Sequence, residues 1–219
     1  AKGNQLTSTD PLGNVNSNAY DAAGNLLSPT NALGQTIRND YDGTGNLSAT
    51  RDLLGNITAS FAYDPTGNLT STTDALGVSR GFAYDSSGNQ TGTTFTWVNP
   101  ANAADIRPVV TQTIYDDAGQ VIRTIDPQGN ESSTVYNEIG KPVASTDRLG
   151  NVSETVYDPR GNVIESRHAD GTLSRSFYDD NGRPVITMDR HVPGTQANGS
   201  RSTYDAVGRV IRSERLANV

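Results

Sequence analysis

A seven-residue pattern, Tyr-Asp-x-x-Gly-Asn-apolar, recurs along the whole chain of 219 residues. Its clearest copy is Tyr63-Asp64-Pro65-Thr66-Gly67-Asn68-Leu69. Successive copies start 21, 22, 21, 31, 21, 21, 21 and 26 residues apart, so the period is 21 with two insertions. The chain has 9 Tyr, and every one of them starts a copy. A constant period of this size is typical of a repeat architecture.

Three residues of each copy are predicted to have structural roles: the tyrosine, the residue after it and the glycine. The sixth copy has Asn in place of Asp. The predicted structural residues are Tyr20, Asp21, Gly24, Tyr41, Asp42, Gly45, Tyr63, Asp64, Gly67, Tyr84, Asp85, Gly88, Tyr115, Asp116, Gly119, Tyr136, Asn137, Gly140, Tyr157, Asp158, Gly161, Tyr178, Asp179, Gly182, Tyr204, Asp205 and Gly208.

A second turn signal lies between successive tyrosines, and most copies read Asp-x-x-Gly. It occurs at Asp10–Asn14, Asn31–Gly34, Asp52–Asn56, Asp74–Gly77, Asp126–Asn130 and Asp147–Asn151. Asp170-Gly171 is interpreted as a shortened version. In such turns the Asp side chain accepts backbone N–H groups, and glycine adopts the left-handed conformation that closes a bulged hairpin.

Five or six residues rich in Thr, Val, Ile, Leu, Ser and Tyr separate the two turns of each repeat. Short runs of this composition between turn residues predict β-strands. We therefore expect one hairpin per repeat, in an all-β antiparallel strip of about 18 strands without a helix longer than a turn or two.

The motif at this period resembles the YD repeat, also called the Rhs repeat. This repeat occurs in bacterial Rhs and polymorphic-toxin proteins, in the B and C components of insecticidal toxin complexes, and in teneurins. The resemblance covers essentially the whole chain. Departures occur where Gln120, Lys141, Arg183 and Arg209 replace the motif Asn. We expect them to weaken individual turns without changing the register.

The resemblance implies a strip of hairpins that curls into a spiral shell or tube. It also implies a structural, non-catalytic module that forms the wall of a secreted or surface-exposed bacterial protein, either a β-shell or a tubular or filamentous assembly. Residues 1–219 are expected to be a single array of about nine repeats without terminal caps, as part of a longer protein or polymer. The implied partners are further repeats of the same polypeptide or neighbouring copies, joined by strand edges, and an enclosed toxin segment.

Composition agrees with a thin structure. Only 33% of the residues are hydrophobic and 6% aromatic, which is little for a thick core. Repeat arrays need less, because each unit contacts only its neighbours. The formal net charge of −7 argues against nucleic acid as a partner, since such binding depends on Lys and Arg. The chain has no Cys and no apolar run long enough for a membrane helix.

Candidate chemistry is sparse. His168 and His191 lie in different repeats without a nucleophile in a recognisable setting, so we expect no catalytic residue, no cofactor and no metal site. The larger insertion, in 91–111, contains Trp97, the only Trp of the chain. Projecting loops often carry recognition residues. The alternative function is therefore an adhesion module that binds a glycan or a cell surface through the Trp97 loop.

Overall fold

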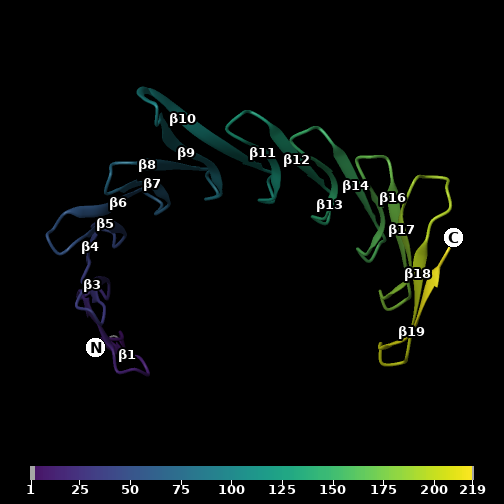
Figure 1. Ribbon diagram of the computed structural model, residues 1–219, viewed down its shortest axis with the longest axis horizontal. Helices are drawn as coiled ribbons and strands as arrows, with labels where there is room; N and C mark the ends of the chain where they lie inside the picture. The colour runs from purple at the N-terminus through teal and green to yellow at the C-terminus, as the bar shows by residue number, and fades with distance from the viewer. Residues whose placement is uncertain (1–2, 219) are drawn as a thin grey trace. The chain divides into compact units, whose positions relative to one another are not determined.

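The computed structural model describes residues 3–218, and in this part of the chain all regular structure is β-strand (Figure 1). The strands are β1 (Thr7–Thr9), β2 (Val15–Tyr20), β3 (Leu26–Thr30), β4 (Arg38–Tyr41), β5 (Leu47–Arg51), β6 (Ile57–Tyr63), β7 (Leu69–Asp74), β8 (Ser79–Tyr84), β9 (Gln90–Asn99), β10 (Asn102–Tyr115), β11 (Val121–Ile125), β12 (Glu131–Tyr136), β13 (Pro142–Thr146), β14 (Val152–Tyr157), β15 (Val163–Arg167), β16 (Leu173–Tyr178), β17 (Pro184–His191), β18 (Gly199–Tyr204) and β19 (Val210–Leu216). The predicted all-β fold class is confirmed.

Strands that follow one another in the chain pair with one another in the sheets. β1, β2 and β3 form one sheet in that order, and β4 to β19 form a second sheet of 16 strands, also in chain order. The chain divides into two compact units, and the boundary between them falls between Gln112 and Thr113, within β10. Each unit is a run of antiparallel hairpins, as the two turns per repeat predict.

A β-bulge shifts the register at the tyrosine in eight of the Tyr-Asp hairpins. Tyr63 pairs with Leu69 while its neighbour Ala62 pairs with Ser71, so Thr70 is an extra residue on its strand. The same shift occurs in the second unit, where Tyr157 pairs with Val163. A bulge increases the local twist of the strand pair, and here it recurs with the sequence period.

The turns have the geometry that the sequence predicts. In the third copy the Gly67 N–H donates to the Asp64 carbonyl at 3.0 Å, and the Asp64 N–H donates to the Asn68 carbonyl at 2.9 Å. Gly67 has φ = 91°, in the left-handed region that side-chain-bearing residues avoid. The interpretation of Asp170-Gly171 as a shortened turn is wrong. His168 takes the first position there, and its N–H donates to the Thr172 carbonyl at 2.8 Å.

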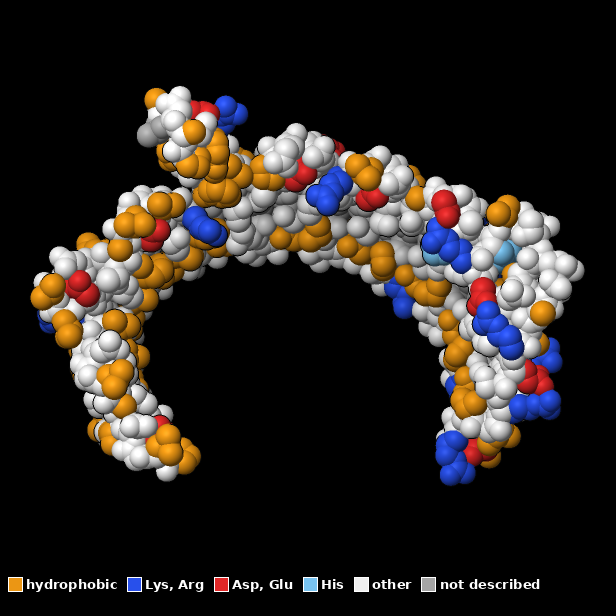
Figure 2. Space-filling view, in the orientation of Figure 1, with side chains coloured by type: hydrophobic (Ala, Val, Ile, Leu, Met, Phe, Trp, Pro, Cys, Tyr) orange, Lys and Arg blue, Asp and Glu red, His pale blue; other side chains and the backbone are white. Residues whose placement is uncertain are grey.

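Few side chains are buried, because the sheet is a single layer. Among the described residues only Ala49, Leu173 and Ala197 count as buried apolar residues. In β14 exposure alternates, with Thr155 and Tyr157 half-buried and Val156 exposed. The tyrosine face is therefore the better covered face of this strand. Figure 2 shows in orange where the apolar side chains of the molecule lie. The expectation of a thin structure is confirmed.

The insertion at 91–111 is not a loop. It lengthens β9 and β10 into a two-stranded ribbon, in which Trp97 pairs with Arg107 and Val98 with Ile106. The ribbon ends in a turn at Asn99–Asn102. The predicted recognition residue therefore lies within a strand, because Thr, Val and aromatic residues favour a continuous ladder over an irregular loop.

Replacement of a turn glycine should separate two contributions to stability. One is the cost of a left-handed backbone, and the other is the cost of a contact between the new Cβ and a neighbouring side chain. Gly67 has open space where a Cβ would lie, whereas a Cβ at Gly161 would meet Lys141 Cε at 2.6 Å. We expect Gly67→Ala to lower the free energy of unfolding by about 1–2 kcal/mol, through the left-handed backbone alone. Gly161→Ala should cost more, because Lys141 must also move.

Chemical denaturation of the two variants measures the difference. In the Lys141→Ala background the Gly161→Ala substitution should cost no more than Gly67→Ala does. An equal effect of Gly161→Ala with and without Lys141 would contradict the assigned contact.

Candidate functional site

The Asp side chain organises each turn. In the third copy Asp64 Oδ1 accepts the backbone N–H groups of Thr66 and Asn68, both at 2.9 Å. The Thr66 hydroxyl donates to the same oxygen at 2.7 Å, and Asn68 Nδ2 donates to Asp64 Oδ2 at 3.0 Å. The motif Asn therefore serves the turn through its side chain, a role that sequence reasoning missed. Its regular spacing four residues after the Asp was the available signal.

These hydrogen bonds favour the charged carboxylate. They lower the pKa of Asp64 from 3.8 to about 2, with the Thr66 hydroxyl as the largest cause and the Asn68 N–H as the next. Other turn carboxylates have lowered pKa values for the same kind of reason: Asp10, Asp21, Asp42, Asp52, Asp85, Asp126, Asp147, Asp158, Asp179 and Asp205.

The tyrosine hydroxyls join neighbouring repeats. Six tyrosine hydroxyls each donate a hydrogen bond to a backbone carbonyl of the preceding repeat. The accepting residue stands two positions after a turn glycine of that repeat. The pairs are Tyr20 to Gln5 at 3.1 Å, Tyr41 to Leu26 at 3.0 Å, Tyr136 to Val121 at 3.1 Å, Tyr157 to Pro142 at 2.9 Å, Tyr178 to Val163 at 2.9 Å and Tyr204 to Pro184 at 2.8 Å. Sequence reasoning predicted a structural role for these tyrosines but missed these hydrogen bonds.

A sequence signal for this contact existed. The motif position holds tyrosine in all nine copies, while the 4 Phe of the chain lie elsewhere. Ring packing alone would accept either residue. A position that always carries the phenol group indicates a use for its hydroxyl.

Residues that replace the motif Asn contact the next turn. Gln120 Nε2 donates to the Gly140 carbonyl at 2.9 Å, and Lys141 Nζ donates to the Gly161 carbonyl, also at 2.9 Å. Lys141 Nζ also lies 5.2 Å from the centroid of the Tyr157 ring, within cation–π range. Asn4, which follows a turn glycine in the same way, makes the equivalent contact with the Gly24 carbonyl at a longer distance of 3.4 Å.

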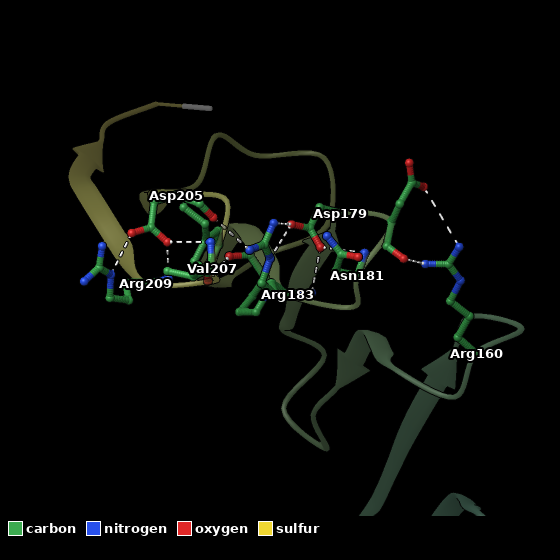
Figure 3. A network of polar contacts seen from close by, with 10 residues as sticks. Arg160, Asp179, Asn181, Arg183, Asp205, Val207 and Arg209 are labelled. Carbon is green, nitrogen blue, oxygen red and sulfur yellow. Dashed lines mark hydrogen bonds and ion pairs between the residues drawn. The ribbon is translucent and has the colours of Figure 1, made fainter.

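Arg183 combines both kinds of contact. Its Nε donates to Asp179 Oδ2 at 2.7 Å, in place of the motif Asn, and its Nη1 lies 3.4 Å from the Asp205 carbonyl (Figure 3). Its guanidinium also lies over the Tyr204 ring, 4.6 Å from the centroid. Arg209 Nε likewise donates to Asp205 Oδ2 at 2.7 Å. The expectation that the replacements weaken their turns is therefore wrong for Arg183 and Arg209, which keep a side-chain bond to the turn Asp.

Ion pairs join charged side chains within and between neighbouring strands of the second unit. Glu165 accepts from Arg167 Nε and Arg175 Nε, both at 2.7 Å, and Arg167 Nη1 donates to Glu154 at 3.0 Å. The two arginines lower the pKa of Glu165, with Arg175 the larger cause. Most of these groups are half-exposed, so each pair contributes little to stability.

Trp97 has one face partly occupied. The Arg107 guanidinium lies 6.0 Å from its ring centroid, and Arg107 also pairs with Asp105 at 2.8 Å. The residue as a whole is 39% exposed. Part of its surface is therefore open to contact with another molecule.

The structure brings no catalytic constellation together around the two histidines. His168 opens a turn, and His191 Nδ1 lies 2.7 Å from the Asp189 carbonyl. Within residues 3–218 no group of three or more His, Cys, Asp or Glu side chains is placed to hold a metal ion. Among these residues there is also no helix long and apolar enough to cross a membrane.

Removal of one tyrosine hydroxyl tests its inter-repeat bond. Tyr178→Phe keeps the ring and leaves the Val163 carbonyl without this donor. We expect the free energy of unfolding to fall by about 0.5–1.5 kcal/mol. Phe177→Leu, at the neighbouring exposed position, is a control that should change it less. Equal stability of Tyr178→Phe and wild type would show that the bond contributes nothing.

Acid should weaken the turns selectively. Asp64 has a lowered pKa in the folded state, so its stabilisation is complete above pH 4 and is lost as the pH falls towards 2. Asp64→Asn keeps an acceptor oxygen but cannot titrate, and Asn137 shows that asparagine fits this position. The difference in melting temperature between wild type and Asp64→Asn should therefore shrink between pH 6 and pH 2. A constant difference would contradict the turn assignment.

A model of the RHS repeat family matches the chain four times, at residues 20–57, 63–96, 115–152 and 136–173. Together these matches cover more than half of the chain. A search of curated protein sequences gave no significant match.

Several solved structures have a similar fold. The Photorhabdus luminescens Tc holotoxin pore aligns with a TM-score of 0.69 and 16% identity, over 98% of this chain and 12% of the other chain. A crystal structure of TcdB2–TccC3–TEV aligns with a TM-score of 0.69 and 17% identity, with the same coverage of each chain. TcdB2–TccC3 without its hypervariable C-terminal region aligns with a TM-score of 0.68 and 16% identity. The present chain thus spans about an eighth of the length of these relatives, and by its repeated motif it belongs to the RHS repeat family.

Proposed function

We propose that the chain is a structural, non-catalytic module that forms part of the wall of a larger secreted or surface-exposed bacterial assembly. The observation that carries this proposal is that its recurring motif residues serve the turns themselves or the neighbouring repeat. Asp64 organises its own turn, and Tyr178 binds the repeat before it. A residue that binds a substrate would not need to recur in every repeat.

The similarity to the Tc toxin structures supports the proposal that this chain forms part of the wall of a larger protein. The Tc toxin structures contain chains about eight times longer, in which a stretch with this fold occupies 12%. We infer that further repeats of the same kind extend the sheet of this protein. We also infer that the complete assembly encloses a separate segment, such as a toxin. Further repeats are the expected partners at the ends of the sheet.

The ends of the strand order give this proposal a physical basis. In the described sheet β19 has one neighbour, β18, so the outer edge of Val210–Leu216 has backbone groups available for another strand. Exposed strand edges are templates for further pairing. Arg215 of this strand forms an ion pair with Asp189 at 2.5 Å, so its charge is directed back towards the sheet.

The alternative, glycan or cell-surface binding through Trp97, has weaker support. Arg107 lies over the indole, and the residue is part of a regular ribbon. A glycan array with wild type and Trp97→Ala distinguishes the two functions. We expect no specific binding from either protein, and specific binding that the substitution abolishes would favour the alternative.

Electron microscopy of the protein in its natural material tests the wall directly. We expect hollow shells or tubular or filamentous particles, because a single-layer sheet with available edges is extended by more repeats. Dispersed single particles of the size of one 23.2 kDa chain would contradict the proposal.

A further inference from the structure

The Tyr-Asp turn that begins at Tyr204 repeats the geometry of the turn before it. Arg183 Nε donates to Asp179 Oδ2 at 2.7 Å, and Arg209 Nε donates to Asp205 Oδ2 at the same distance of 2.7 Å. The backbone N–H of each arginine also donates to the Oδ1 atom of the same carboxylate, at 3.0 Å and 2.8 Å. The two side chains are therefore held by their own turns in the same way.

The two arginines differ in what covers them. The guanidinium of Arg183 lies 4.6 Å from the centroid of the Tyr204 ring, and the Arg183 side chain is 28% exposed. The side chain of Arg209 is 80% exposed. The ring that covers Arg183 comes from the next repeat, and in the described sheet β19 has a strand on one side alone. Arg209 therefore offers a position for an aromatic ring that its own repeat does not fill.

A backbone carbonyl beside Arg209 repeats the other half of this contact. The Pro184 carbonyl accepts the hydroxyl of Tyr204 at 2.8 Å. Tyr204 pairs with Val210 across its hairpin just as Tyr178 pairs with Pro184. Corresponding backbone groups of neighbouring hairpins have the same direction, so the Val210 carbonyl is directed towards the outer edge of β19. It has the place of an acceptor for a tyrosine hydroxyl.

The exposure of apolar side chains in β19 indicates the same edge. Ile211 is 65% exposed and Val210 is 55% exposed. The residues that correspond to Ile211 in β13, β15 and β17 are Val143, Ile164 and Val185, and all three are half-buried. Each of those strands has a neighbour on both sides. A further strand beside β19 would give Ile211 the same coverage.

The contacts within the sheet identify the chemistry of the occupant. Arg183 and the Pro184 carbonyl contact the same side chain, Tyr204, one through the ring and the other through the hydroxyl. In all six tyrosine bonds the donor follows the acceptor in the chain by 15 or 20 residues. All nine tyrosines of the chain are half-buried, so a second copy presents no exposed tyrosine to this edge. A further repeat of the same polypeptide fits better.

We propose that Arg209 and the Val210 carbonyl form a receiving site for the tyrosine of a further Tyr-Asp hairpin in the same polypeptide. The tyrosine ring packs on the Arg209 guanidinium, and its hydroxyl donates to the Val210 carbonyl. This inference rests on the proposed wall function and deepens it, because it names the groups that select the next repeat. A backbone edge accepts strands of many sequences, whereas this site favours an aromatic ring that carries a hydroxyl.

Extension of the chain by one hairpin tests the receiving site. The extended protein is the full chain of 219 residues followed by a second copy of residues 194–216, which repeats the spacing of 26 residues between Tyr178 and Tyr204. Amide exchange of β19 is measured in the natural and the extended chain. We expect the added hairpin to pair with β19 and to slow its exchange by about tenfold or more.

Substitutions on the two sides of the contact separate it from strand pairing. Arg209→Gln should reduce the protection of β19 about 3- to 10-fold more when the added hairpin carries its tyrosine than when Leu replaces that tyrosine. Arg209→Gln also removes a bond within its own turn, and the comparison with Leu cancels that loss. Phe in place of the added tyrosine keeps the ring and removes the hydroxyl, and it should reduce protection about 3-fold.

Arg212→Gln is the matched control. It removes the same charge from β19, but Arg212 forms an ion pair with Glu214 of its own strand. Its effect on the protection of β19 should be the same whether the added hairpin carries Tyr or Leu.

Two results overturn the inference. If the added hairpin pairs with β19 but Arg209→Gln has the same effect with Tyr and with Leu, the receiving site does not exist. The wall function then stands, with backbone edges as the contact between repeats. If the added hairpin leaves the exchange of β19 unchanged, this edge accepts no further repeat, and the inferred extension of the sheet is also wrong.

Discussion

A single-layer sheet cannot bury many side chains, so each repeat of this chain depends on contacts with its neighbours. Only three apolar residues of the described chain are buried, namely Ala49, Leu173 and Ala197. Backbone ladders connect adjacent strands, but the tyrosine hydroxyl adds a bond that connects one hairpin to the next. Stability in such an array is a sum of local and nearest-neighbour contributions. The motif therefore recurs because every repeat needs the same contacts with its neighbours to be stable.

The copies of the motif differ in the contacts that one position makes with the next repeat. Asn68 bonds only within its own turn, through Asp64 and Thr66. Lys141 and Arg183, at the equivalent position, reach the next turn and the next tyrosine ring. The second half of the chain is also richer in Lys and Arg. Longer cationic side chains at this position thus add contacts between repeats without changing the backbone.

Much of the fold could be predicted from the sequence, because turn chemistry is local. Asp and Gly at fixed spacing determine where each hairpin reverses, and the predicted strands lie between them as expected. The turn at His168 was misjudged, since the sequence pattern expected Asp where His stands. The ribbon around Trp97 was also misjudged, because an insertion has no period from which to infer its structure.

The contacts between repeats were harder to predict. The bond from Tyr178 to Val163 joins residues 15 positions apart on strands that are adjacent only in the folded sheet. The reach of Lys141 to Gly161 depends on the lateral spacing of the turns. Such contacts follow from register, which the sequence indicates only after the bulge at each turn is known. The constant choice of tyrosine over phenylalanine was the one local hint.

Hydrogen exchange of a single-hydroxyl variant tests most directly whether the array is held by nearest neighbours. Tyr136→Phe removes the bond to the Val121 carbonyl, which is 3.1 Å long in the wild type. We expect faster amide exchange in β11, β12 and the strands beside them, with β16 to β19 unchanged. Faster exchange throughout the second unit would show global cooperativity instead of neighbour coupling. Unchanged exchange everywhere would show that the hydroxyl bonds do not hold the repeats together.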